Sequence, residues 1–243
     1  MAVIEADGVI IKEVKVGEQD KIITVFTKQL GKISVSAGGV RSPKSRLKGA
    51  QLFCYSHLTL YASQRGYRLN DCELIHTFRE LSDDLELLSY AAYFADIIAL
   101  GEQDKVPNPP LLQLFLNTLY LLSTRKKTAV LLKSIYELRA ACLMGFQPRL
   151  HACVRCGREE GAFGISNSAG GLVCRGCMAD CIPISSAVLA AMRHISYAPP
   201  DKIFSFQASG ETMQGLGKIC ESYLLYQLDI RPKTLTFLKE LFT

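Results

Sequence analysis

The sequence lacks the features that mark membrane and secreted proteins. It contains no run of about eighteen apolar residues, so we expect no membrane-spanning segment. Residues 1–7 have neither the basic start nor the apolar core of a signal peptide. Without such a peptide, the nine cysteines are expected to be reduced thiols and not a disulfide framework. These absences predict a cytoplasmic protein.

Recognisable catalytic motifs are also missing. No G-x4-G-K-[ST] phosphate-binding loop is present. The four histidines are separated along the chain, and none belongs to an H-E-x-x-H or nucleophile motif. We therefore predict no catalytic residue and no small-molecule substrate. A nucleic-acid-processing enzyme with an unrecognised site remains an alternative.

Acidic residues are absent from one long stretch. No Asp or Glu occurs between Lys21 and Asn70, although the net charge of the whole chain is only +5. An unopposed positive surface is typical of proteins that neutralise phosphates, so we predict a nucleic-acid partner. The candidate DNA-binding residues from this stretch are Lys32, Arg41, Lys44, Arg46, Lys48, Arg65 and Arg68. The alternatives are a solvated basic face and a surface that meets an acidic protein.

The same part of the chain reads as strands. Five β-branched, partly alternating runs, separated by turn residues, occupy 8–14, 21–27, 32–37, 52–61 and 67–78. Five short strands in so few residues predict a small OB-like barrel that binds nucleic acid on one strand face. Aromatic rings near the cations are candidates for stacking on bases, although most are expected in the core: Phe26, Phe53, Tyr55, Tyr61 and Tyr67.

Helical patterns follow the strands. The first is expected to begin with Ser82 as its N-cap and to end at Gly101; others occupy 111–123, 128–143, 185–196 and 210–229, before a short tail. The fold class is thus predicted to be a multi-part α+β protein. Its expected parts are an OB-like barrel (1–80), an all-helical domain (81–150), an inserted zinc module (151–182), and C-terminal helices that pack on the helical domain (183–243).

Four cysteines form two C-x2-C pairs, Cys153/Cys156 and Cys174/Cys177. This spacing predicts a tetrahedral thiolate site for Zn2+, with no open position for a catalytic water. The zinc would therefore be structural. Iron is an alternative metal, and His151 or Cys181 is an alternative ligand.

Two local motifs, together with this order of parts, resemble the RecO family of bacterial recombination mediators. Residues 38–47 are similar to that family's G-[AG]-x-R-x-P-[KR]-S-R-[FL] loop. Residues 136–148 resemble its F-E-L-R-L-L-x-x-x-G-[YF]-x-P helix end, with Tyr136 in place of Phe and a shortened spacing before Gly145.

The resemblance implies a non-enzymatic DNA repair protein located at the nucleoid. Such proteins bind single- and double-stranded DNA, anneal strands, engage the acidic tail of the single-strand-binding protein, and act with RecR to load recombinase. A cation beside an apolar groove suits an acidic tail, so the candidate tail-binding residues are Lys133, Ile135, Leu138 and Arg139. The alternative for Arg139 is a buried ion pair, and the alternative for the protein is an adaptor that does not bind DNA directly.

Overall fold

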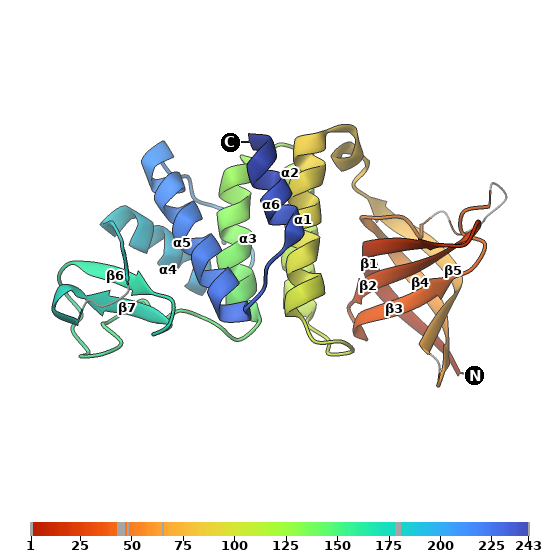
Figure 1. Cartoon of the computed structure of the whole chain (residues 1–243), viewed down its shortest axis with the longest axis horizontal. Helices are drawn as coiled ribbons and strands as arrows, with labels where there is room; N and C mark the ends of the chain where they lie inside the picture. Colours follow the sequence, from red (N-terminus) through yellow and green to blue (C-terminus); the bar gives the residue numbers. More distant parts are fainter. Residues whose placement is uncertain (1, 43–46, 48, 65, 178–180, 243) are drawn as a thin grey trace. The chain divides into compact units, whose positions relative to one another are not determined.

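The computed structural model describes residues 2–42, 47, 49–64, 66–177 and 181–242 (Figure 1). The chain divides into two compact units. The first unit contains Met1–Thr124 and Pro232–Thr243, and the second contains Arg125–Arg231. The domain boundaries expected near residues 80, 150 and 182 stay a prediction.

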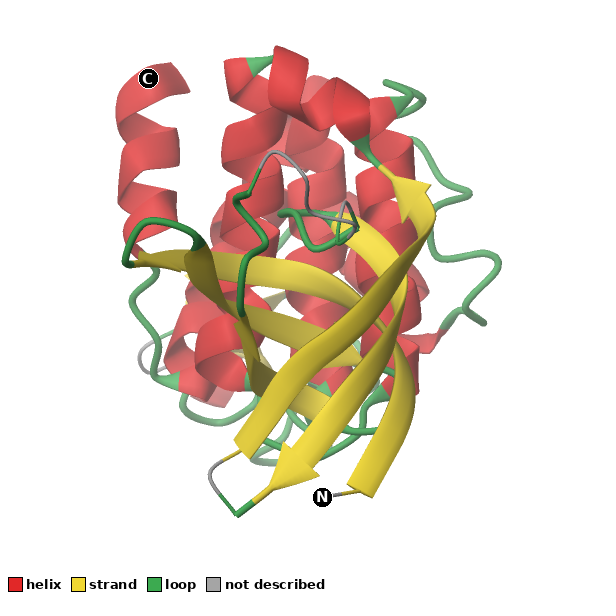
Figure 2. Cartoon of the chain, turned by 90° about the vertical axis from the view of Figure 1, so that its right-hand side faces the viewer, coloured by secondary structure: helices red, strands yellow, loops and turns green. Residues whose placement is uncertain are grey.

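Five strands of the first unit form a closed barrel with the order β1-β2-β3-β5-β4 (Figure 2). They are β1 (Ala2–Val16), β2 (Asp20–Thr27), β3 (Gly31–Ala37), β4 (Cys54–Ser63) and β5 (Gly66–Thr77). Strand β1 pairs antiparallel with both β2 and β4. A short parallel pairing of β3 with β5, at Val35–Tyr67 and Ser36–Arg68, closes the ring. The predicted OB-like barrel is confirmed.

The alternation of apolar and polar residues fixes which face of each strand is buried. In β3, Ile33 and Val35 are buried, whereas Ser34 and Ser36, which alternate with them, are exposed. Successive side chains of a strand point to opposite faces, so the β-branched residues fill the barrel and the serines face outward. A register shift between Ile10 and Lys12 in β1 lies where this long strand continues beyond its pairing with β4.

Helices complete the first unit. They are the 3-10 helix η1 (Arg79–Asp83), α1 (Leu85–Gly101), α2 (Pro109–Ser123) and α6 (Lys233–Phe242). The N-cap of α1 is Asp84, whose carboxylate accepts hydrogen bonds from the backbone N–H groups of Glu86 and Leu87. The prediction of Ser82 as this cap was wrong, because the preceding turn winds into η1 and moves the helix start two residues along the chain.

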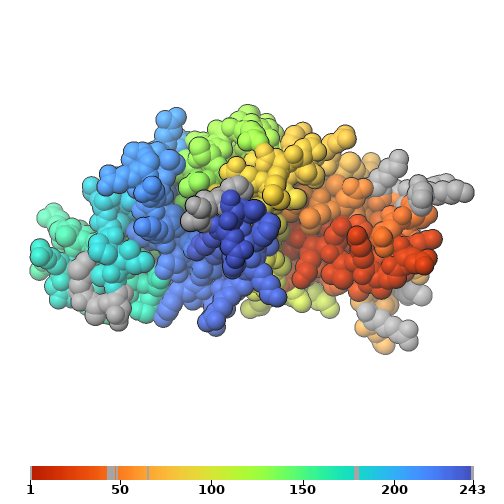
Figure 3. Space-filling model, turned by 45° about the horizontal axis from the view of Figure 1, so that its top comes forward, coloured from red at the N-terminus to blue at the C-terminus, as the bar shows by residue number. Residues whose placement is uncertain are grey.

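Helix α6 occupies the segment that was expected to be only a short tail. Its apolar positions Leu235 and Leu238 are buried, and Thr234 donates a hydrogen bond to Asp96 of α1 at 2.8 Å. In the space-filling view, the dark blue C-terminal segment lies against the yellow segment that carries α1 (Figure 3). Packing of this amphipathic face is what makes so short a helix stable.

The second unit combines three helices with a small sheet. The helices are α3 (Ala129–Leu143), α4 (Ser186–Tyr197) and α5 (Gly210–Leu228). The sheet contains β6 (Phe163–Ser166), β7 (Gly171–Cys174) and β8 (Ile182–Pro183), with the 3-10 helix η2 (Arg175–Cys177) after β7. Asn167, in the β6–β7 turn, donates to the Ser222 hydroxyl at 2.7 Å and accepts from Gln227 at 2.6 Å, so the turn is fastened to α5.

No helix in the described part of the chain combines the length and the apolar character that a bilayer span requires.

Candidate functional site

Two of the predicted DNA-binding cations are exposed on the barrel. Arg41 follows β3, and Arg68 lies in β5 opposite Ser36 of β3. Four further candidates, Lys44, Arg46, Lys48 and Arg65, lie outside the described residues. The described part of the candidate interface contains Arg41, Arg68 and the side chains that surround them.

The connection that carries Arg41 is held against the β1–β2 turn. The Arg41 guanidinium donates to the Gly17 carbonyl at 3.2 Å, and its backbone N–H donates to the Gln19 carbonyl at 3.0 Å. The Gly39 N–H donates to the Asp20 carboxylate at 2.8 Å. Gly39 has a φ of 66°, a conformation that favours glycine, which explains why a glycine stands at this turn. These contacts fix the start of the basic loop at the tip of the β1–β2 hairpin.

Lys32 has a different position from the other cations. Its side chain is only 11% exposed, and its ammonium donates to the Ala99 carbonyl at 2.6 Å and lies 3.3 Å from the Asp104 carboxylate. A charge that is bonded in this way fastens β3 to the end of α1 and to the connection that follows. Little of it is presented to a ligand.

A cavity of about 560 Å³ lies at the mouth of the barrel. We call it the mouth pocket. Its charged lining residues are Glu13, Lys15, Lys21 and Arg41, and the base of the β3–β4 connection covers one side. Lys21 and Glu13 form an ion pair at 2.7 Å. The sequence did not single out Lys15, because this residue precedes the acid-free stretch and only strand pairing brings it opposite Lys21.

A second cavity of about 340 Å³ lies on the outer side of β2 and β3. Its lining combines the partly exposed Ile22, the serines Ser34 and Ser36, and Tyr67 of β5. Lys105, from the α1–α2 connection, also lines it; this lysine has a φ of 62° and its N–H donates to the Lys32 carbonyl. No sequence pattern indicated Lys105, which lies far along the chain from the barrel.

Of the five aromatic candidates, the structure separates core from surface. Phe26 and Phe53 are buried, at 0% and 3% exposure, and do not face a ligand. Tyr61 is exposed, and Tyr55 and Tyr67 are partly exposed, with Tyr67 also packed against the hydrophobic core of the barrel. Tyr67 alone among them lines one of the two cavities described above.

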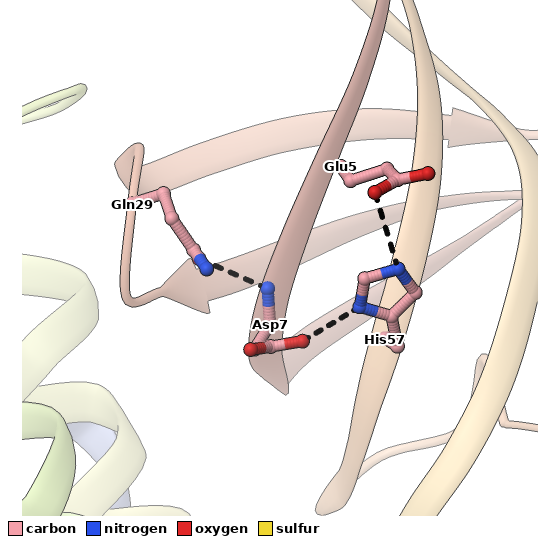
Figure 4. A network of polar contacts seen from close by, with 4 residues as sticks. All are labelled: Glu5, Asp7, Gln29 and His57. Atoms are coloured by element: carbon pink, nitrogen blue, oxygen red, sulfur yellow. Dashed lines mark hydrogen bonds and ion pairs between the residues drawn. The ribbon is translucent and has the colours of Figure 1, made fainter.

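Acidic residues surround His57, where β1 pairs with β4. His57 of β4 contacts Asp7 of β1 at 2.7 Å and lies 3.9 Å from Glu5 (Figure 4). The Asp7 backbone N–H donates to Gln29 at 3.0 Å. The hydrogen bond to Asp7 is the main cause of the raised pKa of His57. The acids around His57 therefore disfavour a phosphate backbone at this place on the barrel.

The four predicted metal ligands are brought together. The sulfur atoms of Cys153, Cys156, Cys174 and Cys177 all lie within 4.8 Å of one another. The backbone N–H of Cys174 donates to the Cys153 sulfur at 3.3 Å, and this bond is the main cause of the lowered pKa of Cys153. Neither His151 nor Cys181, both within the described residues, belongs to the group. Four thiols with N–H groups directed at sulfur fit a metal ion that prefers thiolates.

The predicted tail-binding residues lie on α3. Ile135 and Leu138 are fully buried in the second unit. Lys133 forms ion pairs at 2.7 Å with both Glu137 and Glu221, and Arg139 donates to the carbonyls of Ile195 and Ser196 at the end of α4. These bonds of Arg139 are to backbone carbonyls, and no acid of α1 is among them.

Comparisons with known proteins cover nearly the whole chain. The family model described as "Recombination protein O N terminal" matches residues 1–78, and "Recombination protein O C terminal" matches residues 82–236. The DNA repair protein RecO of Acetivibrio thermocellus is 35% identical over 246 residues, which cover 99% of this chain and 98% of that protein. The protein of the same name from Thermoanaerobacter sp. is 31% identical, with 99% of both chains covered. That of Bacillus subtilis is 29% identical, with 90% and 87% covered. The barrel, the helical part and the cysteine group thus occur in a chain that belongs to the RecO family of DNA repair proteins.

Proposed function

We propose that this protein is a non-enzymatic mediator of DNA repair and homologous recombination that binds single- and double-stranded DNA through its barrel. The observation that carries the proposal is the complete absence of Asp and Glu between Lys21 and Asn70, in the segment that forms β2, β3, β4 and the start of β5. Membership of the RecO family supports it.

The contacts divide by chemistry. Phosphates are held by Arg41, Lys44, Arg46 and Lys48, and Arg65 and Arg68 extend this track. Lys32 has a structural role, because its ammonium bonds to the Ala99 carbonyl and lies beside Asp104. Unpaired bases suit the cavity on β2 and β3, because an aromatic ring such as Tyr67 stacks on any base. Two strands neutralised on one basic surface repel each other less, so annealing follows without a chemical step.

The salt dependence of DNA affinity tests this assignment. A variant with Arg41, Lys44, Arg46 and Lys48 all changed to Ala should lose affinity for single strands. The plot of log affinity against log salt should become shallower by about 0.7 for each phosphate that is no longer neutralised. A control variant removes four exposed cations outside the barrel: Arg79, Lys202, Lys218 and Lys233. Equal slopes for the two variants would remove the basic loop from the DNA site.

Zn2+ is the cofactor we assign to the cysteine group. Four thiolates complete a tetrahedral shell and leave no position for a catalytic water, so the metal holds the Cys153–Cys156 turn to the end of β7 and to η2 and supplies no reaction chemistry. Iron fits four thiolates as well, and metal analysis of the purified protein distinguishes the two.

The partners we assign are the acidic tail of the single-strand-binding protein and RecR, with recombinase loading on coated gaps as the outcome and the nucleoid as the location. These rest on the family resemblance. For the tail, the candidate cations are Arg139 and Lys133, of which Lys133 already pairs with Glu137 and Glu221. Because Ile135 and Leu138 are buried, the apolar part of a tail must use a neighbouring surface.

One experiment separates the mediator from its rivals. Single-strand binding is measured with and without the acidic tail peptide, and labelled DNA is incubated with Mg2+. Binding of both DNA and peptide, with annealing and no cleavage, supports the mediator. Peptide binding without DNA affinity indicates the adaptor, and strand cleavage indicates an enzyme.

A further inference from the structure

The mouth pocket combines a nearly buried lysine with further cations and a single carboxylate. The Lys21 side chain is 13% exposed and that of Glu13 is 28% exposed, and the two pair at 2.7 Å. An ammonium that is largely withdrawn from water needs an anion beside it. Glu13 supplies that anion from within the chain.

The pocket contains more positive charge than Glu13 balances. Lys15 lies directly opposite Lys21 across the β1–β2 pairing, and like charges in this position repel each other. Arg41 lines the same pocket, and its guanidinium bonds to the Gly17 carbonyl. No carboxylate of the described residues is paired with Lys15 or Arg41, so three cations share one acid.

The remaining lining mixes polar side chains with the apolar residues Val40, Leu47, Ala50 and Leu52. Ser42 and Gln51 lie on the side of the β3–β4 connection and offer hydroxyl and amide donors. A guanidinium together with ammonium groups is the donor set that recognises phosphate oxygens. Cavities at the mouths of barrels commonly bind ligands, and a volume of about 560 Å³ admits a phosphate with its neighbouring sugar.

We propose that the mouth pocket is a phosphate-binding site and that Glu13 occupies it as an intramolecular competitor. In the free protein the Glu13 carboxylate neutralises Lys21. When a phosphate group binds between Lys15, Lys21 and Arg41, it replaces this carboxylate, which turns toward solvent. Glu13 thereby weakens binding and makes it less dependent on salt. The phosphate belongs either to a nucleic-acid backbone or to a free anion. Where the phosphate belongs to a nucleic-acid backbone, this inference rests on the proposed function and deepens it.

Removing the competitor is the direct test. Glu13→Gln should raise single-strand affinity about 1.5-fold to fivefold, the range of one partly exposed ion pair. It should also steepen the log–log salt dependence by about 0.7, because Lys21 now contributes a counterion-releasing contact. Glu18→Gln is the matched control, since Glu18 is exposed in the adjacent β1–β2 turn and does not line the pocket. Equal gains in affinity and equal slopes for the two variants would overturn the proposal and leave DNA binding by the barrel intact.

A second pair of variants removes a cation. Lys15→Ala should lower affinity more than Lys12→Ala does, because Lys12 is an exposed lysine of the same strand outside the pocket. Equal reductions in affinity contradict a specific site. Competition by inorganic phosphate, against chloride at matched ionic strength, then identifies the source: competition indicates a free anion, and its absence a phosphodiester.

If the unchanged protein binds no DNA, the proposed function fails but the pocket is still tested. Inorganic phosphate should then raise the unfolding temperature of the full chain above that in chloride, and Lys15→Ala should abolish the rise. A rise that persists in Lys15→Ala, or no rise at all, would overturn the pocket as well.

Discussion

At the scale of single residues, the contact of His57 with Asp7 has a consequence for pH dependence. The folded-state pKa of His57 is raised, chiefly by its hydrogen bond to Asp7, with charges on Asp7, Glu5 and Glu73 adding to the effect. A group whose pKa is raised by folding stabilises the fold below its unfolded pKa, and this contribution is lost as pH rises through the folded pKa. His57 therefore stabilises the barrel in mildly acidic solution more than in basic solution.

We predict that Asp7→Asn lowers the pKa of His57 toward its ordinary value of 6.5. The variant should also lose more thermal stability at pH 5.5 than at pH 8.5. The imidazole is followed by NMR titration, and the unfolding temperature by circular dichroism. Glu5→Gln is the comparison: because this carboxylate lies 3.9 Å away, its effect on the pKa should be smaller. An effect of Glu5→Gln as large as that of Asp7→Asn would contradict the dominant role of the hydrogen bond.

Single-residue roles divide into those that sequence can show and those that need the fold. The four cysteines were found from spacing alone, since two C-x2-C turns aim their sulfurs at one point. Lys32 was chosen from composition, but its ammonium bonds to α1 and its following connection. A charge pattern shows that a lysine is present, but not where its ammonium group lies in the fold. For the same reason Lys15 and Lys105 were missed: each reaches its cavity through tertiary contacts.

At the scale of elements, α3 is held to α5 by a charged group inside the second unit. Lys133 lies between Glu137, which is 0% exposed, and Glu221, which is 18% exposed. Burial alone would lower the pKa of Lys133, but the two carboxylates outweigh it and the pKa is raised. The ammonium therefore stays charged, and Glu137 depends on it.

We predict that Lys133→Met destabilises the second unit by about 3–5 kcal/mol, because it leaves the Glu137 carboxylate buried without its cation. The double variant Lys133→Met, Glu137→Leu should recover much of this loss, since an apolar pair needs no charge compensation. Urea unfolding measures both. Lys218→Met, at an exposed position of α5, is the control and should change stability little. If the double variant were as unstable as the single one, the cost would have another origin than the orphaned carboxylate.

Helix α3 shows why hydrophobic periodicity predicts the position of a helix better than it predicts which of its residues are exposed. The stripe containing Ile135 and Leu138 correctly indicated α3, but an apolar stripe is equally suited to a groove and to a core. In this fold both residues of the stripe are fully buried. Helix α6 was missed for a related reason: its ten residues have little stability alone and depend on packing against α1.

At the scale of the whole molecule, the chain separates the candidate DNA contacts from the metal centre. The barrel belongs to one compact unit and the four cysteines to the other. The order of strands, helices and cysteines could be predicted from the sequence because each has its own local period or spacing. The division into these two units could not be predicted in the same way. Helix α6 returns from the end of the chain to the first unit, and no local pattern encodes that contact.

This separation predicts that loss of the metal affects stability before it affects DNA binding. Cys174→Ser removes one of four thiolates and should lower both the bound zinc and the unfolding temperature, because structural zinc contributes directly to folding free energy. The affinity of the folded protein for single-stranded DNA should change less than twofold. Zinc analysis, calorimetry and a binding titration below the unfolding temperature measure the three quantities.

Cys220→Ser is the matched control, since Cys220 is a buried thiol of the same unit that lies outside the cysteine group. It should leave zinc content unchanged, even where it costs some stability. The decisive comparison is between zinc loss and DNA affinity. A Cys174→Ser protein that stays folded but no longer binds DNA would place DNA contacts in the cysteine unit, and the assignment of DNA binding to the barrel alone would then be wrong.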